Sequence, residues 1–333
     1  MIFMKRIIKK TLLLLEKTVL NVYENIFITP LFGKKRNVQH IWKPSNYSRI
    51  SSIFWHLVQK PMEKRGIYLP LTFNRIHDKQ IFKTFHDEHT VLDEFIHKNY
   101  DDVDKVFVDI GASDGVDMSN TFNLVLQNYK GYSFEVDDSK FAKMATIYRD
   151  FPNISLFKTK ITPDNVSRHL ASLDLPEVIK ILNLDIDSYD YFVLEELLKD
   201  FKFQFLILEI NPLFPMSVDF AVEFNENFQW EGNMFQGASI SMFYKLLCKN
   251  EYSLIWIDRS FVLGINNDYL KDNINTIGET EIDEILNNTL KENDNYRWQR
   301  FKNYRLGTPE DIIIKAKEEF KSYSNFYIKE SGF

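Results

Sequence analysis

Short apolar runs alternate with stretches of helical periodicity through the middle of the chain. Runs rich in β-branched and aromatic residues predict strands at 106–110, 132–136, 154–158, 178–186, 203–210, 252–257 and 261–264. Between them, apolar residues at helical spacing predict helices over 116–129, 140–148, 165–173, 191–198 and 239–248. The first strand is apolar on both faces, as in the interior of a parallel sheet covered by helices. The alternation predicts an α/β fold with a doubly wound, Rossmann-like sheet of about seven strands.

The two ends of the chain lack this alternation. Prolines and aromatic residues are spread over 30–84, and charged segments of helical pattern follow residue 270. Thr308-Pro309-Glu310-Asp311 is typical of a helix start, because it offers a cap, a proline in the first turn and acids near the positive dipole end. We therefore divide the chain into an N-terminal extension (1–84), a Rossmann-like domain (85–270) and a helical C-terminal extension (271–333).

The first residues of the chain predict an amphipathic helix, because apolar positions recur at helical spacing between 8 and 26. The apolar run at 11–15 is short and is interrupted by Glu16 and Lys17, so it indicates neither a signal peptide nor a membrane-spanning helix. Two roles stay open for this helix. It packs on the protein itself, or it brings residues 1–36 to an anionic membrane surface as a peripheral contact.

Composition narrows the class of protein. Of the 333 residues, 44% are hydrophobic, which is enough for a packed core. The formal net charge of −6 argues against a nucleic acid partner held by a broad basic field. One cysteine, Cys248, excludes an internal disulfide and a cysteine-based zinc site, and this fits the reducing cytoplasm. We expect a globular cytoplasmic protein, with membrane contact only at its periphery.

The stretch from Val106 to Gly115 joins the first strand to a glycine-containing turn. Asp109 lies near the end of the strand, while Gly111 and Gly115 let the backbone bend and approach a ligand. Glu135 ends the next strand about twenty residues later, where a carboxylate can accept hydrogen bonds from both hydroxyls of a ribose. The turn lacks the Gly-x-Gly-x-x-Gly spacing of a pyrophosphate site, and Asp109 would repel a pyrophosphate. Its charge suits the ammonium and sulfonium groups of S-adenosylmethionine, which is the cofactor we expect.

From about 85 to 270 the sequence resembles class I S-adenosylmethionine-dependent methyltransferases, and more narrowly the FkbM-type and related bacterial methyltransferase-like proteins. The motifs that carry the resemblance are Val-Asp-Ile-Gly-Ala-Ser-Asp-Gly at 108–115 with Asn-Thr at 120–121, Ser-Phe-Glu-Val-Asp at 133–137, Ile-Thr-Pro-Asp-Asn at 161–165, Leu-Asp-Ile-Asp-Ser-Tyr-Asp-Tyr at 184–191, Leu-Glu-Ile-Asn-Pro at 208–212 and Gly-Ala-Ser at 237–239. The chain departs from the family pattern at Ser188, where a glycine is expected.

The resemblance implies a set of cofactor-binding residues. The methionine end would be held by the first turn, that is by Asp109, Gly111, Ala112 and Gly115. The ribose and adenosine would be bound by the segment Glu135, Val136 and Asp137. The adenine would lie beside Ile161 and Thr162, and the transferring methyl group would lie beside Asp185.

A second group of polar residues follows the fourth and fifth predicted strands. It consists of Asp185, Asp187, Glu209 and Asn211. Carboxyl ends of neighbouring parallel strands are where open α/β sheets bind their ligands, and these oxygen ligands suit Mg²⁺ or Ca²⁺. The arrangement is similar to that of metal-dependent O-methyltransferases, in which the ion acidifies an acceptor hydroxyl pair. In the other interpretation Asp187 and Asp190 cap the next helix, and Glu209 contacts only substrate.

The candidates for a general base are Asp185, His86 and His89. Methyl transfer from a sulfonium is an in-line displacement that needs positioning of the acceptor and removal of its proton. His86 and His89 precede the first strand, where a cover over the cofactor could form, and their spacing places both on one side of a predicted helix. Each histidine has the alternative of a purely structural role.

The resemblance implies a methyltransferase that modifies a hydroxyl group of a sugar in a surface glycan or its precursor. The departure at Ser188 and the aromatic N-terminal region are compatible with an alternative, a methyltransferase-like protein that binds or assembles partners in glycan synthesis without catalysis. A short-chain dehydrogenase or epimerase would need a Tyr-x-x-x-Lys pair, which the sequence lacks.

Overall fold

The computed structural model of the chain describes residues 103–116, 118–149, 151–291, 301 and 303–332. The predicted N-terminal extension, its membrane contact through 1–36, and His86 and His89 lie outside the described residues. None of the described helices has both the length and the apolar character that a membrane-spanning segment requires.

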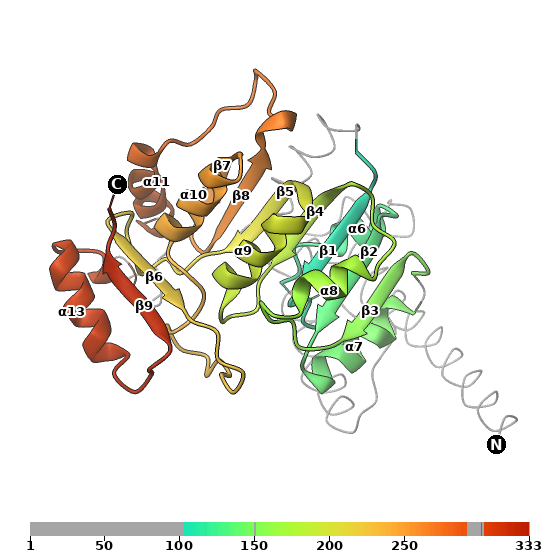
Figure 1. Cartoon of the computed structure of the whole chain (residues 1–333), viewed down its shortest axis with the longest axis horizontal. Coiled ribbons are helices and arrows are strands. Elements are labelled where there is room, and N and C mark those ends of the chain that lie inside the picture. The colour runs from blue at the N-terminus through green and yellow to red at the C-terminus, as the bar shows by residue number, and fades with distance from the viewer. Residues whose placement is uncertain (1–102, 117, 150, 292–300, 302, 333) are drawn as a thin grey trace, which may run out of the picture. The chain divides into compact units, whose positions relative to one another are not determined.

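A seven-stranded sheet forms the centre of the described part of the chain (Figure 1). Its strands are β1 (Val106–Ile110), β2 (Lys130–Glu135), β3 (Ile154–Lys158), β4 (Val178–Leu184), β5 (Lys202–Glu209), β7 (Tyr252–Asp258) and β8 (Phe261–Asn266). Their order across the sheet is β3-β2-β1-β4-β5-β8-β7. The first five strands pair in parallel, and β8 runs antiparallel to both of its neighbours. The predicted doubly wound, Rossmann-like α/β sheet is confirmed.

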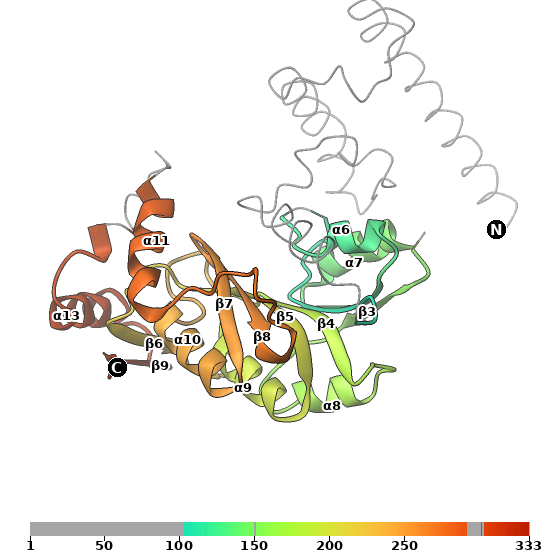
Figure 2. The same ribbon diagram turned by 90° about the horizontal axis from the view of Figure 1, so that it is seen from above.

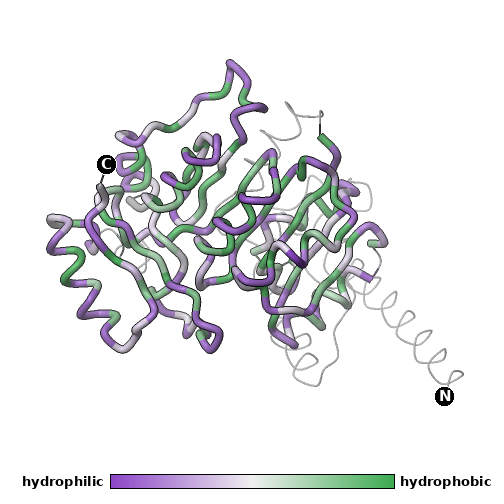
Figure 3. Tube along the Cα trace, viewed as in Figure 1, coloured by the Kyte–Doolittle hydropathy of each residue, from purple (hydrophilic) through white to green (hydrophobic). Residues whose placement is uncertain are grey.

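Helices cover both faces of this sheet (Figure 2). One face carries α6 (Phe122–Leu126) and α7 (Asp138–Tyr148), and the other carries α8 (Val166–Ala171), α9 (Asp190–Asp200) and α10 (Ile240–Lys249). Two buried apolar clusters result, one on each face. Phe107 belongs to the cluster with α6 and α7, whereas Val108 and Ile110 belong to the cluster with α8 and α9. This double burial explains why β1 is apolar on both faces, and Figure 3 shows apolar stretches along the central strands.

The helix predicted over 116–129 is shorter in the structure, where α6 begins only at Phe122. The reason lies in the preceding loop, since Ser113 and Met118 have φ angles of 53° and 57°, which a right-handed helix cannot accommodate. The Ser119 hydroxyl accepts hydrogen bonds from the N–H groups of Thr121 and Phe122 and so turns the chain into α6. The residues that precede the helix are thereby left to line a cavity.

A small second sheet joins two segments that are distant in the sequence. The strands β6 (Val218–Val222) and β9 (Phe326–Glu330) pair antiparallel. Neither strand is predicted by the sequence pattern, and β9 lies in the C-terminal extension, which was expected to be helical. The helices of that extension are α11 (Glu279–Lys291) and α13 (Pro309–Glu319). The helix start at Thr308 is confirmed, with a reciprocal capping box between Thr308 and Asp311.

Candidate active site

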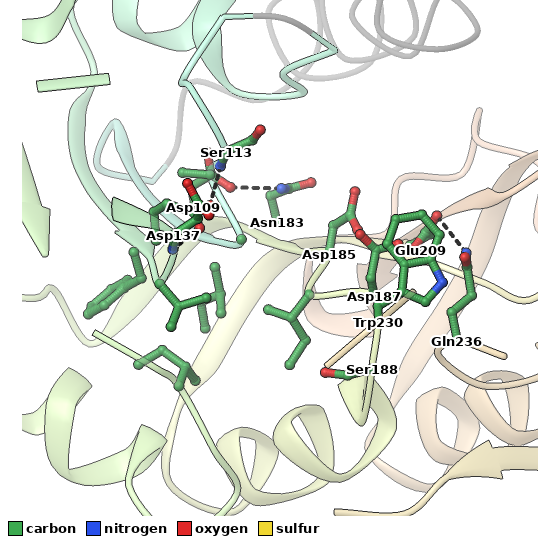
Figure 4. A pocket seen from close by; sticks show the side chains of 18 of the residues that line it. Asp109, Ser113, Asp137, Asn183, Asp185, Asp187, Ser188, Glu209, Trp230 and Gln236 are labelled. Carbon is green, nitrogen blue, oxygen red and sulfur yellow. Dashed lines mark hydrogen bonds between the residues drawn. The ribbon is translucent and has the colours of Figure 1, made fainter. Parts of the chain in front are cut away.

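A cavity of about 690 Å³ opens at the carboxyl ends of β1, β2, β4 and β5 (Figure 4). This position follows from the strand order, because the chain leaves β1 toward β2 on one side and β4 lies on the other, which opens a crevice between the loops. Ten residues named by the sequence analysis line the cavity: Asp109, Gly111, Ala112, Glu135, Val136, Asp137, Ile161, Asp185, Asp187 and Glu209. Residues that follow or end five strands, β1 to β5, therefore meet at one place.

The turn after β1 requires glycine at position 111. Gly111 has a φ angle of 91°, and a Cβ atom built there would lie 1.7 Å from the backbone oxygen of Asp185. The N–H groups of Gly111 and Ala112 both donate to the backbone oxygen of Phe134, each at 3.0 Å. The turn is therefore packed directly against the end of β4 and tied to β2, so a ligand would meet its backbone closely.

Asp109 is buried, with 1% of its surface exposed, and two side chains hold its carboxylate. The Thr121 hydroxyl donates to Oδ2 at 2.6 Å and the Asn183 amide donates to Oδ1 at 2.8 Å. Burial raises the pKa of Asp109 to about 6, although both hydrogen bonds act in the opposite direction. Asn120 extends the network by donating to Asn183 at 2.9 Å, and its own Oδ1 is buried without a donor among the described residues. This end of the cavity is rich in acceptors that suit a cationic ammonium group.

Backbone N–H groups orient Glu135 from both sides. Its Oε2 accepts from Ser113 N–H at 2.8 Å and its Oε1 accepts from Asp137 N–H at 2.6 Å. Each carboxylate oxygen can accept a second hydrogen bond, so both remain available to a diol. The Asp137 carboxylate caps α7 by accepting from Lys140 N–H at 2.8 Å, which leaves Val136 as an exposed apolar side chain at the cavity edge.

Two residues implied by the resemblance do not line the cavity. Gly115 has a φ angle of 78°, and a Cβ atom there would lie 2.9 Å from the side chains of Met144 and Tyr148 on α7. Position 115 therefore requires glycine so that the turn can pack against α7. Thr162 donates its N–H to Asn165 Oδ1 at 2.9 Å and helps to start α8. Of the two residues expected beside the adenine, Ile161 and Thr162, only Ile161 lines the cavity.

The opposite end of the cavity is acidic. Asp185, Asp187 and Glu209 each offer a carboxylate oxygen, and these oxygens all lie within 4.8 Å of one another. Burial and the neighbouring charge of Asp187 raise the pKa of Asp185 well above its ordinary value, and burial and the charge of Asp185 do the same for Glu209. Gln236 donates to Glu209 Oε1 at 3.1 Å, but Glu209 Oε2 is buried without a donor in the described part of the chain. A proton or a cation between these oxygens would relieve their repulsion.

Asp190 shapes the loop that carries two of these acids. Its carboxylate accepts from Ile186 N–H at 2.8 Å and from Ser188 N–H at 2.9 Å, so it holds the loop before α9 instead of capping that helix. The left-handed backbone conformation falls on Asp187, whose φ is 56°, and not on Ser188. The serine that stands where the family pattern has glycine therefore needs no left-handed conformation.

The structure does not bring Asn211 to the acidic group. Asn211 is 1% exposed, and its amide donates to the backbone oxygens of Met234 and Gln236 at 3.0 and 2.9 Å. Its Oδ1 accepts from Leu213 N–H at 3.1 Å. The side chain is used to tie the loop after β6 to the end of β5, and this placement corrects the expectation that it joins Asp185 and Glu209 as a metal ligand.

Other cavity residues escaped sequence reasoning. Asn183 lies within an apolar strand, and four others lie in the connection after β6, namely Phe228, Gln229, Trp230 and Gln236. That connection has no regular periodicity, and the sequence signal beside the cavity is the pair of aromatic residues Phe228 and Trp230 within the polar segment 225–233. Trp230 Nε1 donates to the backbone oxygen of Asn233 at 2.9 Å, which fixes the direction of the indole.

No protein-family model matches the chain, and no curated protein matches it by sequence. Its fold is similar to a solved S-adenosylmethionine-dependent methyltransferase from Aquifex aeolicus, with 15% identity, 58% of this chain and 94% of that chain covered, and a TM-score of 0.33. Magnesium protoporphyrin IX methyltransferase (ChlM) from Synechocystis PCC 6803 with bound SAH has 10% identity, 66% and 100% coverage, and a TM-score of 0.35. The N-terminal domain of EvdMO1, solved with SAH and D-fucose, has 8% identity, 54% and 83% coverage, and a TM-score of 0.35. These similarities concern the fold alone and assign no activity to this chain.

Proposed function

We propose that the chain is an S-adenosylmethionine-dependent methyltransferase that acts on a hydroxyl group of a sugar in a surface glycan or its precursor. One observation carries the proposal. A single cavity has the Asp109–Gly111 turn and Glu135 at one end and three carboxyl groups at the other. The first end suits a cationic nucleoside, and the second suits an acceptor that carries hydroxyl groups.

The residues at the first end fit the cofactor. The backbone at Gly111 is open to close approach, and Asp109 and Asn120 Oδ1 offer acceptors to an ammonium group. Glu135 is held by two backbone N–H groups in an orientation that leaves both oxygens able to accept ribose hydroxyls. Val136 and Ile161 supply apolar surface to the base.

The carboxyl groups at the acidic end bind and deprotonate the hydroxyl group that receives the methyl group. S-adenosylmethionine supplies an electrophilic methyl group when it is bound. Asp185 lies beside this position, because its backbone oxygen contacts the turn at Gly111 while its side chain lines the cavity. Asp185 accepts the proton of the acceptor hydroxyl, and Asp187 and Glu209 orient the hydroxyl through hydrogen bonds.

The same three carboxyl groups fit a hard divalent cation. Their oxygens are close enough to share one ion, and Glu209 Oε2 has no hydrogen-bond donor among the residues that the structure describes. Mg²⁺ would be held by Asp185, Asp187 and Glu209, and it would lower the pKa of an acceptor hydroxyl. Asn211 is committed to the loop after β6 and takes no part in this ligand set.

Calorimetry with S-adenosylhomocysteine tests the cofactor part of the proposal. We expect the wild-type chain to bind it and Glu135→Ala to weaken binding by about tenfold or more, since one or two charged hydrogen bonds are lost. Glu196→Ala is the matched control, because Glu196 pairs with Lys199 on α9 outside the cavity lining. Absence of binding, or binding equally tight in Glu135→Ala, would contradict the proposal.

Turnover separates the enzyme from the non-catalytic alternative. The full chain is incubated with S-adenosylmethionine carrying a labelled methyl group and with a bacterial glycan extract. Transfer of label to the glycan fraction, lost in Asp185→Asn, is the expected result. Tight cofactor binding with no transfer to any glycan fraction would favour a binding or assembly role.

A further inference from the structure

The acidic end of the cavity is faced by an aromatic wall. Phe228, Trp230 and Phe301 all line the cavity, and Figure 4 shows the Trp230 indole on the side of Asp187 and Glu209. The indole N–H is already used by the backbone oxygen of Asn233 at 2.9 Å. What Trp230 offers to a ligand is therefore the apolar surface of its rings.

Two polar side chains beside this wall have acceptor oxygens that receive no hydrogen bond from the described residues. Glu209 Oε2 and Gln236 Oε1 are both buried without a hydrogen-bond partner among the described residues, and Gln236 is only 4% exposed. The carboxylates of Asp185 and Asp187 add further acceptors. A ligand that satisfies this group must bring several donors along one edge, while another of its faces is apolar.

Hydrogen bonds from other segments of the chain hold the wall in place. The Lys160 ammonium donates to the backbone oxygen of Glu226, and Asn233 donates to the Tyr323 hydroxyl at 2.6 Å. The Tyr323 hydroxyl donates in turn to Glu231 at 2.7 Å, and its ring stacks on Phe235 with centroids 4.0 Å apart. The loop that carries Trp230 is therefore fixed at both ends, and little ordering is needed when a ligand packs on the indole.

We propose that Trp230 is the platform on which the acceptor sugar packs, with the C–H groups of one pyranose face on the indole and its hydroxyl edge toward Asp185, Glu209 and Gln236. This assignment rests on the proposed function. When no cation occupies the acidic group, the assignment also selects the kind of ring, because the three carboxyl groups would repel a phosphate or carboxylate on that ring. The ring bound here is thus an uncharged pyranose, and any charged group of the acceptor lies elsewhere.

Fluorine NMR of the full chain containing 5-fluorotryptophan tests the assignment. The resonance of Trp230 is identified by its loss in Trp230→Phe, and that of Trp256 on β7 serves as the internal control, since Trp256 does not line the cavity. With S-adenosylhomocysteine bound and without divalent cations, methyl glycosides of uncharged pyranoses are titrated as probes. We expect at least one glycoside to shift the Trp230 resonance while the Trp256 resonance stays unchanged.

Two variants complete the test. Trp230→Ala should raise the dissociation constant of that glycoside by about tenfold, while Trp230→Phe keeps most of the affinity and both keep the affinity for S-adenosylhomocysteine. Urea unfolding of both variants confirms that the fold persists.

The assignment would be overturned by glycoside binding that leaves the Trp230 resonance unmoved, or by an equal loss of cofactor and glycoside affinity in Trp230→Ala. Catechol is titrated as a planar aromatic diol, and binding of catechol but of no glycoside would also overturn the assignment. No shift with any glycoside, while the cofactor still binds, would likewise reject Trp230 as the platform. Failure of the wild-type chain to bind S-adenosylhomocysteine would instead reject the proposed function itself.

Discussion

The acidic residues of the cavity differ in their properties because their surroundings differ. Glu135 is oriented by backbone N–H groups, whereas Asp109 is oriented by side chains. Burial raises the pKa values of Asp185 and Glu209, and the charge of Asp187 on Asp185 and that of Asp185 on Glu209 act in the same direction. In the proposed function these three environments fit a diol, an ammonium group and the proton of an acceptor hydroxyl. Residue type alone would not distinguish these roles.

Glycine 111 allows a sharp test at the scale of one residue. Gly111→Ala would place a Cβ atom 1.7 Å from the Asp185 backbone oxygen, so the turn must separate from β4. We expect a loss of several kcal/mol in the free energy of unfolding, together with loss of S-adenosylhomocysteine binding. Urea unfolding and calorimetry measure the two effects.

Gly232→Ala is the control for this substitution. Gly232 also has a positive φ, of 76°, but no atom of the described residues lies within 4 Å of the place that its Cβ would take. Its alanine variant should lose only about 1 kcal/mol from backbone strain and should still bind the cofactor. Similar losses in both variants would show that backbone conformation matters and that the contact with β4 does not.

At the scale of elements, the C-terminal segment supports the loop beside the acidic end of the cavity. The pairing of β6 with β9 brings Tyr323 to the loop that carries Trp230. Arg305 donates to the backbone oxygens of Pro212 and Phe214 and pairs with Asp283 on α11, so it ties the connection after β5 to the same segment. The C-terminal extension, which is charged and largely helical, thus supports the loops around the acidic end of the cavity.

Tyr323→Phe tests this support. The substitution removes the hydroxyl that joins Asn233 to Glu231 and keeps the ring that stacks on Phe235. We expect the KM for the acceptor to rise about threefold to tenfold, because two hydrogen bonds of about 1 kcal/mol each are lost, while the KM for S-adenosylmethionine stays constant. Steady-state kinetics with each substrate varied in turn measures the difference.

Tyr327→Phe on β9 is the companion control, since that ring contacts the Lys329 ammonium on the same strand. It should leave both KM values unchanged. If Tyr323→Phe raised the two KM values equally, its effect would be on the stability of the whole chain and not on the acceptor loop.

At the scale of the whole molecule, stability depends on pH through the buried acid Asp109. Its pKa is about 6 in the folded chain and near 3.8 when unfolded, so the folded state binds its proton first as the pH falls. Stability from this group is therefore fully present below about pH 4 and is lost as the pH rises through about 6. The loss is on the order of 3 kcal/mol.

Asp109→Asn should remove this dependence. The amide can accept from Asn183 and donate to the Thr121 hydroxyl, so the network survives. We expect the free energy of unfolding of Asp109→Asn, relative to wild type, to improve by about 3 kcal/mol between pH 4 and pH 7.5. Asp164→Asn, at an exposed position, is the control in the same urea titrations. A constant difference between variant and wild type would contradict this account.

The amino-acid sequence by itself determined the central sheet and the end of the cavity that Asp109, Gly111 and Glu135 line. Local pattern sufficed there, because strands buried on both faces are apolar throughout and because Asp109, Gly111 and Glu135 lie at the ends of such strands. Residues at the carboxyl ends of adjacent parallel strands must meet, whatever the loops do. The acids at 185, 187 and 209 were brought together for the same reason.

Tertiary structure decided the rest of the site. Trp230 and Gln236 lie in a connection without periodicity, and β9 becomes a strand only because β6 offers it a partner about a hundred residues away in the chain. Asn211 and Gly115 have the residue types and spacing of ligand-binding positions, yet their neighbours engage them in packing and loop anchoring. Short-range pattern encodes which residues end a strand, whereas contacts between distant segments decide which of them face the cavity.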